Sequence, residues 1–115
     1  MVLVFSFSGA AQAEEGWEES SIPMVAAEGY AREKCMKLNE GDQVHYRFSS
    51  INPLNFDIHY HPDAEILFKI KKENVSEFSG EFTSDAEQHY CFTWKNPKAY
   101  AAAWDVMLEY RVLPK

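Results

Sequence analysis

Residues 44–70, VHYRFSSINPLNFDIHYHPDAEILFKI, contain the pattern that decides the fold. Apolar and polar side chains alternate there in three short runs, at 44–48, 54–60 and 66–70. Strict alternation is typical of strands that bury one face, because successive side chains of a strand point to opposite sides. Residues 50–53 and 62–63 contain prolines and separate the runs, as turns between antiparallel strands do. The stretch therefore predicts three antiparallel strands.

The same alternation recurs on both sides of this stretch. It predicts further strands at 30–38, 77–84, 88–94 and 102–112. Gly80 interrupts one of them, which indicates a bulge or a close approach of another group to the backbone. No segment has the sustained period of a helix. The sequence thus predicts an all-β fold, an antiparallel β-sandwich of about seven to eight strands formed by residues 30–115.

Composition limits both the size and the partners of the protein. With 115 residues and 13.3 kDa, the chain has room for one domain. The formal net charge is -7, and the eleven Lys and Arg residues are scattered. A surface that binds nucleic acid needs clustered basic side chains, which release counterions from the phosphates. The composition therefore argues against nucleic acid as a partner.

Residues 1–13 have the features of a signal peptide. The apolar run 2–8 is followed by small residues that end in Ala11-Gln12-Ala13, the A-x-A pattern that signal peptidase cleaves. No Lys or Arg precedes the run, so the leader is either truncated or weak, and a buried first strand is the alternative. No other stretch approaches the roughly 20 apolar residues of a membrane span. We expect a mature protein without a membrane span, in the periplasm or outside the cell.

Residues 14–29 are predicted to be an acidic, flexible lead-in to the domain. Four glutamates surround Trp17, and Pro23 excludes a long helix.

The predicted export bears on the redox state of the two cysteines. In an oxidising compartment, two cysteines in a small domain more often form a disulfide than remain free thiols. We therefore predict a bridge between Cys35 and Cys91. In the chain-entropy model, closing a loop of about 55 residues stabilises a protein by about 4 kcal/mol. The bridge would also remove Cys91 as a nucleophile beside His89.

The segments around the cysteines have a further pattern. Cys35 lies in Glu33-Lys34-Cys35-Met36 ahead of a Gly-containing turn, and Cys91 lies in Tyr90-Cys91-Phe92-Thr93-Trp94-Lys95-Asn96 near the last strands. Over residues 30–112 this resembles the GOLD domain of the p24 (emp24) family. The resemblance implies an eight-stranded, GOLD-like or jelly-roll-like sandwich with the two cysteines linked.

The resemblance has limits that restrict what it implies about function. Asn96 lies further from Cys91 than the family spacing would place it. The family's cargo-receptor role depends on a coiled coil, a transmembrane helix and a cytosolic tail that these 115 residues do not include. The resemblance therefore implies the fold and a general role in protein interaction.

The run 54–60 and its next residue contain a candidate metal site. Asp57, His59 and His61 would lie on one side of a strand, about 7 Å apart. Two such imidazoles can bind one metal, with a carboxylate completing or orienting the set, and His45 on a neighbouring strand can join them. The alternative function is therefore binding of copper or zinc. The simpler interpretation is an outer sheet face that is solvated or contacts a partner.

Catalysis has little support in the sequence. There is no G-x-S-x-G, no P-loop and no glycine-rich nucleotide turn. We therefore predict that the protein is not an enzyme. The expected role is that of an exported binding or accessory module, which recognises a protein or a small ligand through the outer face of one sheet.

Overall fold

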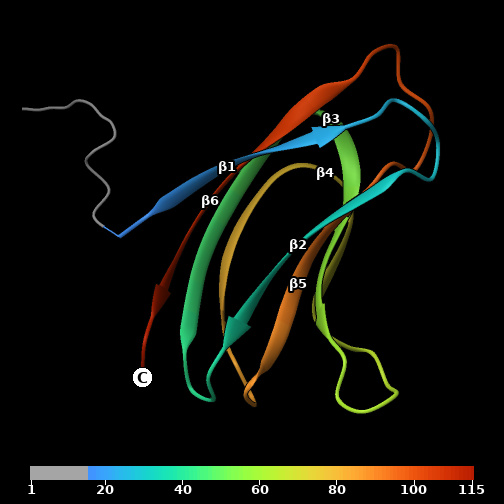
Figure 1. Cartoon of the computed structure of the whole chain (residues 1–115). Coiled ribbons are helices and arrows are strands. Elements are labelled where there is room, and N and C mark those ends of the chain that lie inside the picture. The colour runs from blue at the N-terminus through green and yellow to red at the C-terminus, as the bar shows by residue number, and fades with distance from the viewer. Residues whose placement is uncertain (1–15) are drawn as a thin grey trace, which may run out of the picture.

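A computed structural model describes residues 16–115, so the predicted signal peptide at 1–13 lies outside the described residues. These described residues form six strands, which are β1 (Glu18–Met24), β2 (Ala31–Leu38), β3 (Gln43–Tyr60), β4 (Leu67–Thr83), β5 (Gln88–Lys95) and β6 (Trp104–Leu113). Every strand pairing is antiparallel, and residues 16–115 contain no helix that could cross a membrane (Figure 1). The all-β antiparallel fold predicted from the sequence is confirmed.

The long hairpin of β3 and β4 belongs to both layers of the sandwich. The two strands pair from Gln43 with Thr83 to Tyr60 with Leu67. Residues 43–49 of β3 also pair with β6, and β6 pairs with β1. Residues 55–60 pair instead with β5, and β5 pairs with β2. The first layer is therefore β1-β6-β3-β4 and the second is β2-β5-β3-β4, with the hairpin bending from one to the other (Figure 1).

The strand count is lower than predicted because the chain does not break at residues 50–53, nor between the predicted strands at 66–70 and 77–84. Residues 50–53 were expected to be a turn, but β3 continues through them with register shifts between Ser49 and Leu54. A proline cannot donate to the sheet ladder, so Pro53 marks an irregularity in the pairing and not a chain reversal. The predicted strands at 44–48 and 54–60 are the two halves of β3, and those at 66–70 and 77–84 are the two halves of β4.

The core is an aromatic layer between the two sheets. Inward positions of β3 and β5 place Phe56, Phe92 and Trp94 among the fully buried side chains. The rings of Phe48 and Phe56, from the two halves of β3, have centroids 4.6 Å apart. The rings of Tyr46 and Phe92 form a T-shaped pair with centroids 5.3 Å apart. Tilted and edge-to-face pairs add about 0.5–1.5 kcal/mol each beyond the burial of their area, so these rings hold the two layers together.

Gly80 lies opposite Tyr46 in the β3–β4 ladder. A Cβ at Gly80 would lie 2.8 Å from the hydroxyl oxygen of Tyr46 and 3.1 Å from its Cζ. The close approach that the sequence indicated at this glycine is therefore that of the Tyr46 ring.

Residues 18–24 differ from the flexible lead-in predicted over 14–29. They form β1, which pairs with β6 at seven positions from Glu18 to Met24. Ile22 and Met24 are buried in the core. Two apolar positions beside a proline are too short a pattern to predict a strand. The strand forms because residues 18–24 pair with β6, a contact that the local sequence does not indicate.

Candidate functional site

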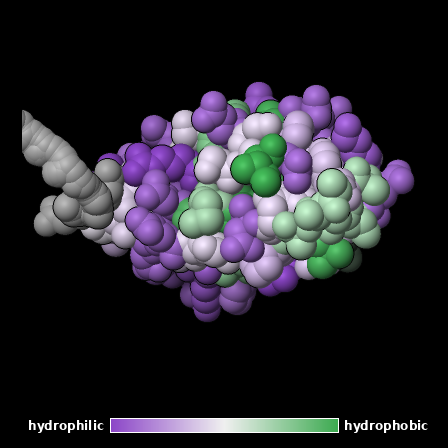
Figure 2. All heavy atoms as spheres, turned by 90° about the horizontal axis from the view of Figure 1, so that it is seen from above, coloured by the Kyte–Doolittle hydropathy of each residue, from purple (hydrophilic) through white to green (hydrophobic). Residues whose placement is uncertain are grey.

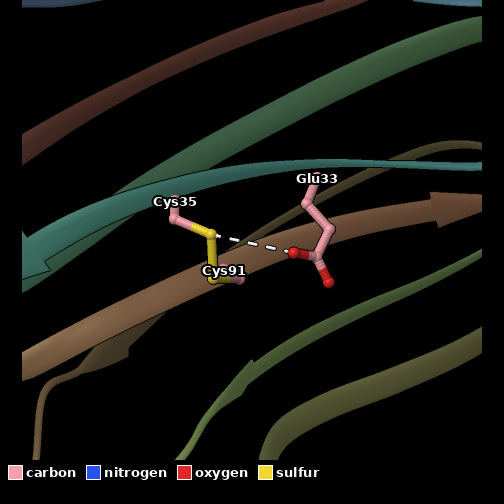
Figure 3. A group of neighbouring side chains, drawn as sticks. All are labelled: Glu33, Cys35 and Cys91. Atoms are coloured by element: carbon pink, nitrogen blue, oxygen red, sulfur yellow. Dashed lines mark hydrogen bonds between the residues drawn. A yellow bond between two sulfur atoms is a disulfide. The ribbon is translucent and has the colours of Figure 1, made fainter.

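Cys35 and Cys91, the cysteines for which the sequence predicts a bridge, are joined by a disulfide. They are direct partners of β2 and β5, on the outer face of the second layer. Figure 3 shows the bridge between the two strands with the carboxylate of Glu33 beside it, 4.0 Å from the Sγ of Cys35. Because both sulfurs are bonded, Cys91 is not available as a nucleophile.

His59 continues the same row across the second layer. It is opposite Cys91 on β5 and Phe68 on β4. Although it points outward, His59 is only 7% exposed. Its Nδ1 lies 2.7 Å from Asp57 Oδ1, and its Nε2 lies 3.6 Å from Glu33 Oε2. The imidazole is thus oriented by two carboxylates, one from its own strand and one from β2.

His61 stands at the edge of this group. The ring of His61 lies 5.1 Å from that of His59 and is nearly perpendicular to it. Asp57, the predicted third ligand, already pairs with Nδ1 of His59. The structure therefore places His59, Asp57 and Glu33 in one connected group, and the participation of Glu33 was not predicted.

His45 belongs to a different part of the molecule. It lies on the first layer, where its Nε2 is 3.0 Å from Gln43 Oε1 and 3.9 Å from Glu81 Oε1. The half of β3 that carries it pairs with β6, whereas the half that carries His59 pairs with β5. The structure does not bring His45 together with the other predicted ligands.

Within residues 16–115, one group of three His, Cys, Asp or Glu side chains has converging ligand atoms. It consists of Glu33, Cys35 and Cys91, whose ligand atoms lie within 4.8 Å of one another. A thiolate is needed to bind a metal, and both sulfurs are consumed by the disulfide. This group therefore is a disulfide beside a carboxylate, and the copper or zinc site stays a hypothesis based on His59 and His61.

An ion pair joins the start of β4 to the β4–β5 turn. Lys69 Nζ lies 2.7 Å from Asp85 Oδ2, and the Tyr60 hydroxyl donates to the same oxygen at 3.2 Å. The hydrogen bond from Lys69 lowers the pKa of Asp85. Burial, together with the charge of Asp85, raises the pKa of Tyr60. Both shifts favour the ionised carboxylate and the neutral phenol at neutral pH.

The outer face of the first layer holds a groove of about 630 Å³. Its floor is formed by outward positions of three neighbouring strands. Arg47 of β3 pairs with Glu109 of β6 and Ser79 of β4. The lining residues are Glu19, Arg47, Phe48, Ser49, Glu77, Phe78, Ser79, Met107, Leu108 and Glu109. The groove therefore spans all four strands of this layer.

The charge in the groove is negative. Three carboxylates, Glu19, Glu77 and Glu109, face one guanidinium, that of Arg47, so the local formal charge is -2. Arg47 Nε lies 2.5 Å from Glu109 Oε1, and its guanidinium stacks over the ring of Trp17 at 4.3 Å. Within residues 16–115, no hydrogen bond or ion pair involves the side chain of Glu19 or Glu77. Two carboxylates in the groove thus lack a counter-charge from the described part of the chain.

Exposed apolar side chains extend from the groove along the same face. The next outward position after Ser49 on β3 is Ile51, which is 83% exposed, and Met107 on β6 is 48% exposed. Val25, one residue after β1, is 50% exposed. Figure 2 shows apolar patches toward the end of the molecule away from the grey N-terminal trace, which is the end that holds the β1–β2 and β5–β6 connections in Figure 1. We call Val25, Ile51 and Met107 the apolar rim.

The connections at this end are held by a buried asparagine. Asn96 is 1% exposed, and its Nδ2 donates to the carbonyl oxygens of Val25 at 2.7 Å and Ala27 at 2.9 Å. The backbone of Tyr100 donates to Ala26 at 2.8 Å. The β1–β2 and β5–β6 connections are thereby tied to each other, so the backbone that carries Val25 is fixed.

The groove could not be found in the sequence. Its polar residues are ordinary side chains at outward positions of four strands, and β1 reaches the groove only through its pairing with β6. The one available signal was the large exposed Ile51, which interrupts a polar run between Ser49 and Asn52.

Comparison with known proteins gives a fold but no family. No family model matches the chain, and no curated protein matches its sequence. Among solved structures, the chain is similar to Aeromonas hydrophila PliG, a periplasmic lysozyme inhibitor of g-type lysozyme, with a TM-score of 0.63 and 8% identity. That similarity covers 91% of this chain and 93% of the other. It is also similar to Salmonella Typhimurium PliG, an inhibitor of the same description, with a TM-score of 0.55, 10% identity and 95% of each chain covered.

The two comparisons agree on a shared architecture over nearly the whole length of the chain. Neither protein is a GOLD domain, and the resemblance to that family stays a prediction.

Proposed function

We propose that this chain is an exported protein-binding module that inhibits a lysozyme of the g type by binding to it. The observation that carries the proposal is its fold similarity, over 91% and 95% of the chain, to two proteins described as periplasmic inhibitors of g-type lysozyme. One fold can serve several functions, so features of the chain itself must support the step from fold to function.

Export is supported by the cysteines. The Cys35–Cys91 disulfide lies on the outer face of the second layer, where reducing agents of a cytosol would reach it. Such bridges persist in the periplasm and outside the cell. The two similar structures are of periplasmic proteins, which is the same class of compartment.

Binding of a protein is supported by the apolar rim. Single exposed apolar side chains are ordinary, but Met107 lines the groove, and Ile51 is the next outward position on β3 after the groove residue Ser49. Apolar patches with a polar surround are typical of protein interaction sites. The backbone at this end is fixed by Asn96, and a surface that is ordered before binding loses little conformational entropy.

The test is inhibition of peptidoglycan lysis by a purified g-type lysozyme. The oxidised chain should reduce the lysis rate in proportion to its concentration until the enzyme is saturated. A c-type lysozyme assayed in parallel shows whether the inhibition is selective. Undiminished lysis by the g-type enzyme at a large molar excess of the chain would refute the proposed function.

A further inference from the structure

We propose that the groove on the outer face of the first layer, together with the apolar rim, holds a cationic segment of the protein partner. The occupant would be a Lys or Arg side chain flanked by apolar residues. This inference rests on the proposed protein-binding function and adds to it the surface and the chemistry of the partner.

Charge is the first argument for a cationic occupant. The groove has a formal charge of -2, and the whole chain has -7. Glu19 and Glu77 approach the groove from β1 and β4, on opposite sides of Arg47. A concave surface lined by one sign of charge attracts and orients the opposite charge. An anionic segment would meet unfavourable electrostatics at every stage of approach.

The position of Arg47 is the second argument. Its guanidinium is engaged by Glu109 at 2.5 Å and by the ring of Trp17 at 4.3 Å. Engaged in this way by Glu109 and Trp17, Arg47 forms no ion pair with Glu19 or Glu77 within residues 16–115. It therefore leaves the carboxylates of Glu19 and Glu77 to interact with a partner.

The size of the groove is the third argument. A volume of about 630 Å³ lies within the range of roughly 300–1,000 Å³ that is usual for binding pockets. It accommodates a long side chain and parts of its neighbours, while the hydroxyl groups of Ser49 and Ser79 in the lining can hydrogen-bond the partner.

The apolar rim adds a requirement that a lone cation would not meet. Ile51 and Met107 lie next to the groove with 83% and 48% of their surface exposed. Burying such side chains against apolar residues of a partner is favourable. A segment that combines a cation with apolar neighbours uses both parts of the surface, whereas a small ion uses only one.

The direct test is an NMR titration of the isotope-labelled chain with a short blocked peptide of alternating Lys and Leu. The same peptide with Glu in place of Lys is the control. We expect amide signals of residues 47–49, 77–79 and 107–109 to shift with the Lys peptide and to stay unchanged with the Glu peptide. Shifts that are absent, equal for both peptides, or spread over the second layer would overturn the inference.

Charge-reversed variants extend the test to the intact partner. Glu19→Lys/Glu77→Lys changes the groove, and Glu40→Lys/Glu65→Lys is the matched control in the β2–β3 and β3–β4 turns, where both glutamates are exposed. Each pair changes the net charge from -7 to -3, because each reversal adds two positive units to the formal charge. The groove pair should weaken binding of the Lys peptide and of g-type lysozyme at least about tenfold, since like charges would face each other. The control pair should change either affinity by no more than about twofold, as expected for charges remote from an interface.

These arms separate failure of the inference from failure of the proposed function. If the groove variant inhibits lysozyme as well as the wild type does, the proposed inhibitor function stands and the groove is not its docking surface. If the Lys peptide binds in the groove but the chain has no effect on lysozyme, the groove is a site for cationic segments and the proposed inhibitor function is refuted. A circular dichroism spectrum and melting temperature like those of the wild type establish that each variant is folded.

Discussion

Replacement of Gly80 by alanine should destabilise the protein, and the structure gives both the sign and the size. The new Cβ would lie 2.8 Å from the hydroxyl oxygen of Tyr46 and 3.1 Å from its Cζ, well inside ordinary contact distance. Tyr46 cannot easily move away, because four aromatic rings have centroids 5.3–6.4 Å from its own, those of Phe56, Phe78, Phe82 and Phe92. Forcing an extra carbon into such packing costs about 1–3 kcal/mol.

The sign of this stability change distinguishes a clash with Tyr46 from the effect of glycine's backbone freedom alone. Without the contact, Gly80→Ala in a strand would stabilise the protein by about 0.5–1 kcal/mol, because glycine loses more conformational freedom on folding. Urea unfolding of the wild type and the variant measures the difference. Tyr46→Phe removes the atom nearest to the new Cβ, so the loss caused by Gly80→Ala should be smaller in the Tyr46→Phe background. A Gly80→Ala variant as stable as the wild type, or more so, would refute this reasoning.

Four further predictions concern the disulfide, two ionisable groups and the metal hypothesis. Cys35→Ser/Cys91→Ser should lower the free energy of unfolding by about 4 kcal/mol, measured in urea, and an unchanged midpoint would contradict the role of the bridge. Burial raises the pKa of Tyr46 to about 12, so the folded state keeps a proton that the unfolded state loses above pH 10. The free energy of unfolding should therefore fall by up to about 3 kcal/mol as the pH rises from 10 to 12, and Tyr46→Phe should remove that part of the decrease. The pKa of Asp85 is lowered by its hydrogen bond from Lys69, so its contribution is present above the unfolded pKa of 3.8 and is lost as the pH falls below it. Because Asp85 is more than half exposed, Asp85→Asn should cost less than about 1 kcal/mol at pH 7 and nothing at pH 2, and an equal loss at both pH values would contradict the ion pair. An excess of Zn²⁺ or Cu²⁺ should leave the melting temperature unchanged, because both nitrogens of His59 already face carboxylates; a rise that His59→Ala/His61→Ala abolishes would establish the metal site instead.

The strands were predictable where the alternation is long and local. The runs 44–48 and 54–60 identified the inward Tyr46, Phe48 and Phe56, because a two-residue period directly states which side of a strand is buried. The alternation does not show whether two neighbouring runs belong to one continuous strand. Residues 50–53 have the composition of a turn, and only the pairing of both halves of β3 with the single partner β4 makes the strand continuous.

The candidate sites were predictable only where their residues are neighbours in the chain. Asp57 and His59 lie two positions apart on β3, and their hydrogen bond follows from that spacing. Glu33 comes close to His59 because β2 pairs with β5 and β5 pairs with β3. No local sequence pattern predicts that register. The groove depends entirely on such pairing, since Glu19 and Glu77 come from strands at opposite edges of the first layer.

The central claim, that this sandwich binds a protein partner, is tested most directly by calorimetric titration of a g-type lysozyme with the oxidised chain. The account predicts a saturable heat at a defined stoichiometry, with an affinity that falls as the salt concentration rises, because a negatively charged groove contributes to binding. The absence of any binding heat at several temperatures, with the chain shown to be folded and its disulfide intact, would contradict the claim.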